Sequence, residues 1–118
     1  KLSEMRIKNG DYVRDGNGGA VMLDGKEEML QRVLYLLSAR RGAFPFMENT
    51  GSRLYLLSRT ARSQRQSAAE QYVAEALGGE SGLTVTGIEL EDGADETTLV
   101  TVTAKYGEDE LTVTATVQ

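Results

Sequence analysis

The C-terminal third of the chain restricts the possible folds more than any other part, because two segments there alternate strictly between apolar and polar residues. Residues 97–106 and 110–117 are rich in threonine and valine and have the period of two that is typical of half-buried strands. The short, glycine-containing connection at residues 107–109 predicts that they pair antiparallel. Residues 83–90 form a third predicted strand, whose alternation Gly87 interrupts as a β-bulge would. We therefore expect an antiparallel meander.

Three helices are predicted ahead of this meander. Asp24 is a suitable N-cap residue, and apolar residues then recur at helical spacing to about residue 40, with Gly42 as the C-terminal cap. A short helix is expected at residues 51–57 and a third at residues 67–77, where a glycine pair ends it. The residues expected to face inward are Leu30, Val33, Leu34, Leu37, Leu54, Leu57, Tyr72, Val73, Ala76 and Leu77.

The N-terminal segment contains short strand-like pieces separated by turns. Asn9 and Gly10 suit a tight hairpin turn because both residues tolerate positive φ, and residues 20–23 are a further short predicted strand. A chain of 118 residues is the size of one domain. The sequence thus predicts a single α+β domain over residues 1–118, with about three helices packed on one face of a small antiparallel sheet and short N-terminal strands.

Composition excludes several kinds of chemistry. Without cysteine or histidine, the chain has no disulfide, no thiolate zinc site and no histidine general base. No apolar run is long enough for a membrane helix, and the first residues lack the apolar core of a signal peptide. Gly25-Lys26 fails the phosphate-loop pattern, and a calcium loop counted from Asp15 has Lys26 where a glutamate is needed. We expect no cofactor and no metal.

The charges are divided unevenly along the chain. Residues 30–69 contain seven arginines, no lysine and one acid, Glu48, so this window is +6 while the other residues sum to −11. Three interpretations stay open: pairing with a protein partner, ion pairs within the chain, and nucleic-acid binding. Arginine suits bidentate pairing with carboxylates, and the domain as a whole is acidic, so nucleic acid is the least favoured partner.

Two parts of the chain are candidate binding surfaces. Phe44 and Phe46 straddle Pro45 in a predicted loop, and at least one of them is expected to pin that loop to the core. The last strand, residues 110–117, has neither proline nor an inward charge to protect an exposed edge. It is either an interior strand covered by an N-terminal strand or an open edge to which a partner adds a strand.

The segment from Gln31 to Leu57 carries a family resemblance. Its leucine-rich helix end, the Arg-Gly-x-Phe sequence at Arg41–Phe44 and the Gly-Ser-x-Leu-x-x-Leu sequence from Gly51 resemble the baseplate wedge proteins of contractile-tailed phages. That family is known as the GPW or gene-25-like lysozyme family, and the likeness is to its variants in prophages of Gram-positive bacteria. Many members have a Glu-Pro-Arg sequence or a proline just before the second glycine, whereas Pro45 lies well upstream of Gly51 here.

The resemblance implies a small structural subunit of the virion tail baseplate, with no enzymatic activity. Such a subunit joins larger wedge and hub proteins and supports the start of the tail sheath, whose contacts are thought to use strand exchange. The lysozyme label would then be a misnomer. A cell-wall glycosidase and a nucleic-acid-binding domain are the alternatives. The candidate partner-binding residues are Arg40, Arg41, Gly42, Phe44, Pro45, Phe46, Gly51, Arg53, Leu111, Val113 and Val117.

Overall fold

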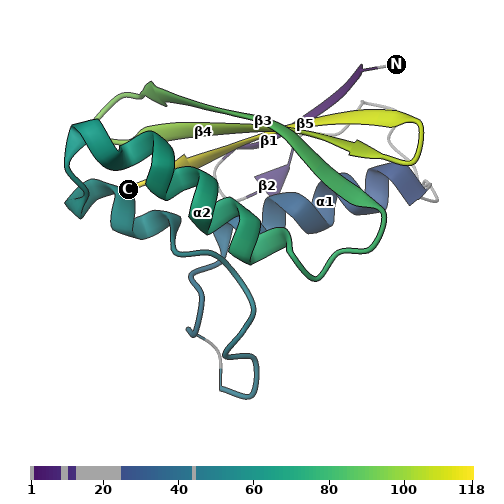
Figure 1. The fold of residues 1–118 in the computed structure, drawn as a ribbon, viewed down its shortest axis with the longest axis horizontal. Coiled ribbons are helices and arrows are strands. Elements are labelled where there is room, and N and C mark those ends of the chain that lie inside the picture. The colour runs from purple at the N-terminus through teal and green to yellow at the C-terminus, as the bar shows by residue number, and fades with distance from the viewer. Residues whose placement is uncertain (1, 9–10, 13–24, 44) are drawn as a thin grey trace.

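Five strands form one sheet in the computed structural model, which describes residues 2–8, 11–12, 25–43 and 45–118. Their order across the sheet is β2-β1-β5-β4-β3 (Figure 1). The three C-terminal strands follow one another as an antiparallel meander, as predicted. They are β3 (Leu83–Asp92), β4 (Thr98–Tyr106) and β5 (Asp109–Val117).

The alternation within these strands predicted their two faces correctly. Val100 lies opposite Ala115 and Val102 opposite Val113, so the apolar residues of β4 and β5 share the buried face. The pairing of β3 with β4 shifts by one residue between Val85 and Gly87. This irregularity is the bulge that Gly87 indicated.

The N-terminal strands join the sheet beside the last strand, which is one of the two arrangements that the sequence left open. β1 (Leu2–Lys8) pairs in parallel with β5, and β2 (Asp11–Tyr12) pairs antiparallel with β1. The hairpin is thus confirmed, although its turn at residues 9–10 lies outside the described residues. The expectation of an antiparallel sheet is confirmed for the meander and wrong for β1 beside β5; the chain between these two strands runs through all the helices and the strands β3 and β4, a connection long enough for parallel neighbours.

The helices lie close to their predicted positions. α1 covers Gly25–Ser38 and α2 covers Arg65–Leu77, with Gly78 at the end of α2. Between them, Leu54–Arg59 and Arg62–Gln64 are 3-10 helices (η1 and η2), where one short α-helix was expected. Because α1 ends at Ser38, Gly42 is not its C-terminal cap; it forms part of the following turn, with a φ of +82°.

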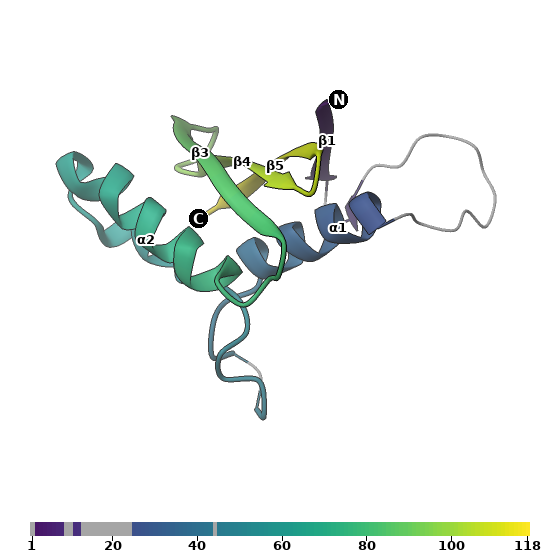
Figure 2. The same ribbon diagram turned by 45° about the vertical axis from the view of Figure 1, so that its right-hand side comes forward.

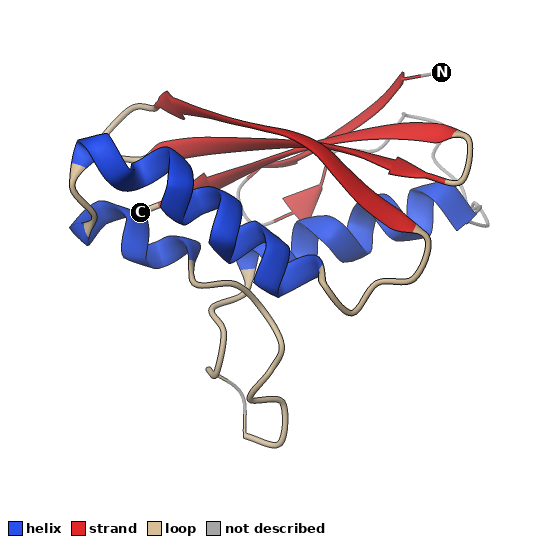
Figure 3. Cartoon of the chain, in the orientation of Figure 1, coloured by secondary structure: helices blue, strands red, loops and turns tan. Residues whose placement is uncertain are grey.

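The helices cover one face of the sheet, as predicted (Figures 2 and 3). α1 packs against β5 and β1, α2 packs against β3, and η1 contacts both α2 and β5. This arrangement confirms the α+β fold. The buried apolar residues are Met29, Leu30, Val33, Leu34, Leu36, Leu37, Leu54, Leu57, Ala69, Val73, Ala76, Leu77, Val100, Val102, Ala104, Leu111, Val113, Ala115 and Val117.

Some predictions fall on residues that the structure does not describe. They are the calcium-loop positions Asp15 and Asn17, the strand at residues 20–23 and the N-cap Asp24. Within the described ranges, no three histidine, cysteine or acidic residues are grouped so that they could hold a metal ion. Neither α1 nor α2 has the length and apolar character of a membrane span, and the described chain contains no other α-helix.

Candidate protein-binding loop

The loop between α1 and η1 projects from the helical side of the domain, away from the sheet (Figure 1). Its two ends are held together by backbone hydrogen bonds: the Arg41 amide donates to Ser52 at 2.9 Å, and the Ser52 amide donates to Ala39 at 2.8 Å. Arg40 and Ser52 form an isolated parallel bridge. The base of the loop is therefore a fixed part of the fold.

Two small residues make this close approach feasible. Gly51 is buried with a φ of +101°, and a Cβ atom there would lie 2.5 Å from the carbonyl oxygen of Ala39. Ser52 is 2 % exposed, and its hydroxyl donates to the carbonyl oxygen of Leu37 at 2.7 Å. That bond satisfies a carbonyl in the last turn of α1, which has no partner within the helix. Gly51 is thus required by the close backbone approach at the loop base, and its predicted partner contact stays a prediction.

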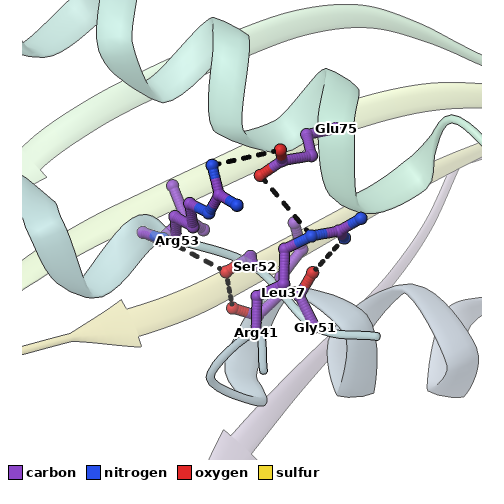
Figure 4. Close-up of polar contacts among 7 residues, drawn as sticks. Leu37, Arg41, Gly51, Ser52, Arg53 and Glu75 are labelled. Carbon is purple, nitrogen blue, oxygen red and sulfur yellow. Dashed lines mark hydrogen bonds and ion pairs between the residues drawn. The ribbon is translucent and has the colours of Figure 1, made fainter. Parts of the chain in front are cut away.

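Arg41 and Arg53 both reach Glu75 on α2 (Figure 4). The Arg41 Nε atom lies 3.8 Å from one Glu75 oxygen, and its Nη1 donates to the Gly51 carbonyl at 3.1 Å. Only 14 % of the Arg41 side chain is exposed, against 50 % for Arg53. The Arg41 guanidinium thus links the loop base to α2, and the partner contact predicted for Arg41 stays a prediction.

Four of the seven arginines in the arginine-rich window form ion pairs with three acids of the described chain. The other two ion pairs of the described residues join Arg32 to Glu80 and Arg62 to Asp92, and the hydrogen bond and attraction of Glu80 raise the pKa of Arg32. Every acid in these four pairs lies outside residues 30–69. Arg40 remains exposed and places its guanidinium 4.2 Å from the centre of the Tyr55 ring.

The tip of the loop is apolar and exposed. Pro45, Phe46 and Met47 are all exposed, and Phe46 has a φ of +69°. The expectation that the loop is pinned to the core by a phenylalanine is wrong for Phe46, which is fully exposed; Phe44 lies outside the described residues. Met47 was not predicted as a site residue, although its position beside Phe46 was a usable signal.

The last strand is an interior strand. β1 pairs with Glu110–Thr114 of β5 on one side, while β4 pairs along its other side. Leu111 and Val113 are each 1 % exposed and Val117 is 8 % exposed, all within the core. The open-edge interpretation of this strand is wrong, and these three residues pack the domain.

One of the two edges of the described sheet is β3, and the other is formed by β2 and β1. Successive residues of an antiparallel strand direct their backbone N–H and C=O groups alternately toward and away from the neighbouring strand. In β3, Ile88, Leu90 and Asp92 direct these groups away from β4. The Gln66 side chain covers one of these groups by donating to the Ile88 carbonyl at 2.9 Å. A hollow of about 250 Å³ between α2 and this edge is lined by Arg62, Arg65, Gln66, Leu90, Glu91, Asp92 and Thr98.

A larger polar hollow, of about 660 Å³, lies beside the β3–β4 turn. Its lining includes the carboxylates of Asp92, Asp95 and Glu96 together with Arg62 and Arg65. All three acids are exposed, and Asp92 is paired with Arg62 at 3.4 Å. A glycosidase needs one carboxyl that an apolar surround keeps protonated, and this polar lining does not offer one.

The comparison with solved structures finds the same fold in another protein. A crystal structure from Geobacter sulfurreducens, described as a "putative tail lysozyme", matches with a TM-score of 0.68 and 13 % identity. The match covers 83 % of this chain and 94 % of the Geobacter chain. The two proteins share one fold. Neither a family model nor a curated protein sequence matches the chain.

Replacing Arg41 by alanine should lower the free energy of unfolding by about 1–2 kcal/mol, since a mostly buried hydrogen bond and an ion pair are lost together. Arg59 is exposed and has no ion pair within the described part of the chain, so Arg59→Ala is the matched control, with an effect within about 0.5 kcal/mol. Urea unfolding of both variants measures the difference. Equal effects would mean that Arg41 does not hold the loop base.

Proposed function

We propose that this protein is a structural subunit of the baseplate of a contractile phage tail or a related injection device. It joins wedge and hub proteins through protein–protein contacts and supports the start of the sheath. The observation that carries this proposal is the fold shared with the Geobacter tail protein over 94 % of that chain. The resemblance of residues 31–57 to baseplate wedge proteins supports the narrower position in the baseplate.

Two surfaces support a role in assembly. The loop at residues 41–51 projects from the body of the domain, and the outer edge of β3 leaves backbone groups at Leu90 and Asp92 without a strand partner in the described sheet. A row of such groups is a template for an added strand. Glu89 and Glu91 are exposed on this edge, so the added strand should carry basic side chains on that face.

Co-expression with the other tail proteins of the same gene cluster tests the function. We expect this protein to co-purify with a wedge or hub protein in a defined ratio, and mass spectrometry should detect it in assembled tails. If it bound none of these proteins and were missing from tail particles, the proposal would be wrong. Nucleic-acid binding predicts instead a mobility shift that weakens steeply with salt.

The β3 edge can be tested in the same assay with Leu90→Pro. The substitution removes an N–H that points away from β4, so the domain should keep its fold while an added strand loses a hydrogen bond. Leu90→Ala removes the same side chain and retains the N–H, which makes it the control. Loss of a sheath or wedge contact in the proline variant alone supports strand addition; equal behaviour of both variants contradicts it.

A cell-wall hydrolase is the second candidate, favoured by the description of the Geobacter protein as a tail lysozyme. A zymogram on peptidoglycan, with Asp95→Asn and Glu96→Gln as variants, separates the two functions. We expect no clearing from the purified protein. Clearing that either variant abolishes would replace the structural role by an enzymatic one.

A further inference from the structure

The tip of the projecting loop combines two unfavourable features. Phe46 is fully exposed, and it adopts a φ of +69°, a region that residues with a side chain rarely occupy. Met47, the next residue, is 46 % exposed. Local strain and exposed apolar surface at one position are typical of sites where a protein meets a ligand or partner.

The tip has no packing partner within the described domain. Gly42, Ala43 and residues 45–49 are all exposed, and the backbone hydrogen bonds of this stretch are the turn bonds from Ala43 to Arg40 and from Thr50 to Met47. The base, in contrast, is fixed by Gly51, Ser52 and Arg41. An anchored base presents the apolar tip in a defined position, which limits the entropy that binding must overcome.

We propose that Phe46 and Met47 form an anchor that inserts into an apolar pocket on another tail protein, with carboxylates at the rim of that pocket. This inference rests on the proposed function, because it takes a tail protein as the partner. A single aromatic side chain in a pocket is the usual form of an interface hot spot. The protein contributes the projecting group, and the partner contributes the hollow.

The charges at the base of the loop indicate the chemistry of the partner's rim. Arg40 is exposed, and Arg53 retains half of its side chain in solvent while it bonds to Glu75. Residues 40–53 contain these two arginines, Arg41 and one acid, Glu48, so the segment is +2. Carboxylates around the partner's pocket would match this charge and orient the loop during encounter.

A membrane is a weaker fit for the same surface. The anchor has two apolar side chains, Glu48 follows it directly, and Arg40 and Arg53 lie at or beside the bridge that forms the base of the loop, not around the tip. The chain as a whole carries a net charge of −5, which opposes approach to an anionic lipid surface. Binding to vesicles is therefore an outcome that the test must be able to detect.

The test places a photo-crosslinking phenylalanine analogue at position 46 of the full chain, in cells that produce the tail proteins. Tyr35, which is 47 % exposed on α1, is the matched control position. We expect position 46 to crosslink to one tail protein, at an apolar segment flanked by Asp or Glu, and position 35 not to do so. That protein is then purified for binding measurements.

Phe46→Gly should weaken the affinity for this purified partner by about 30-fold or more, whereas Tyr35→Ala should change it by less than about threefold. Glycine accepts positive φ, so Phe46→Gly should unfold no more easily than the parent protein, and lost binding would not reflect lost folding. Phe46→Leu, which retains an apolar side chain, should keep part of the affinity.

Several results would overturn the anchor. They are crosslinks only to a second copy of the chain, no crosslink to a tail protein, unchanged affinity of Phe46→Gly, or Phe46-dependent binding to phosphatidylserine vesicles. If the protein were present in tails and Phe46→Gly assembled normally, the anchor would fail while the proposed function stood. Absence of the protein from tails would remove both.

Discussion

Gly51→Ala is expected to lower the free energy of unfolding by about 3 kcal/mol. The φ of +101° disfavours any side chain, and the new Cβ would lie 2.5 Å from the Ala39 carbonyl oxygen and 3.0 Å from two backbone carbon atoms. Because the obstructing atoms belong to the backbone, no side-chain rotation relieves the contact. The base of the loop would have to open.

Gly42→Ala is the control for Gly51. Its φ is +82°, but the nearest atom to an added Cβ is the Glu48 carbonyl oxygen at 3.9 Å. The cost should therefore be about 1 kcal/mol, from backbone conformation alone. Chemical unfolding of both variants gives the comparison. If Gly51→Ala lowered the free energy of unfolding no more than Gly42→Ala, the two chain segments at the loop base would not approach each other this closely.

Leu57→Ala is expected to cost about 3 kcal/mol, within the range of about 2–5 kcal/mol for a fully buried leucine. Leu57 is 1 % exposed and belongs to η1, a six-residue 3-10 helix that contacts α2 and β5. So short a helix has little stability of its own, and its buried side chains hold it in place. The truncation leaves a cavity between the helices and the sheet.

Leu56→Ala provides the comparison within the same helix. Leu56 is only partly buried, so the same truncation should cost about 1 kcal/mol. Thermal and urea unfolding measure both changes. Similar losses at the two positions would mean that η1 does not direct Leu57 into the core as described.

The leucines that follow the candidate loop could be interpreted from the sequence, but its glycines and arginines could not. Leu54 and Leu57 were recognised by their helical spacing, whereas Gly42 was expected to cap α1 and Gly51 to open a helix that begins instead at Leu54. Arg41 carries no local signal of its role, since Glu75 lies 34 residues further along the chain. Phe46 was predicted as a partner-binding residue, and its full exposure is consistent with that untested role.

The sequence by itself determined the local structure of this protein. Alternation of period two set the faces of β4 and β5, helical spacing set the buried side of α1, and Gly78 marked the end of α2. These features depend on backbone geometry and on which side chains avoid water, and both are properties of a short segment. The α+β class followed from their order along the chain.

Only the tertiary structure decided which segments meet. The position of β1 beside β5 makes the last strand an interior strand and leaves β3 as one edge of the described sheet. The contacts of Arg41 with Glu75 and Gly51 make this arginine part of the support of the loop. The local sequence of a strand edge does not specify which strand pairs with it, and that of an arginine does not specify which carboxylate it meets. The choice among them is made by the packing of distant segments, which short-range patterns do not encode.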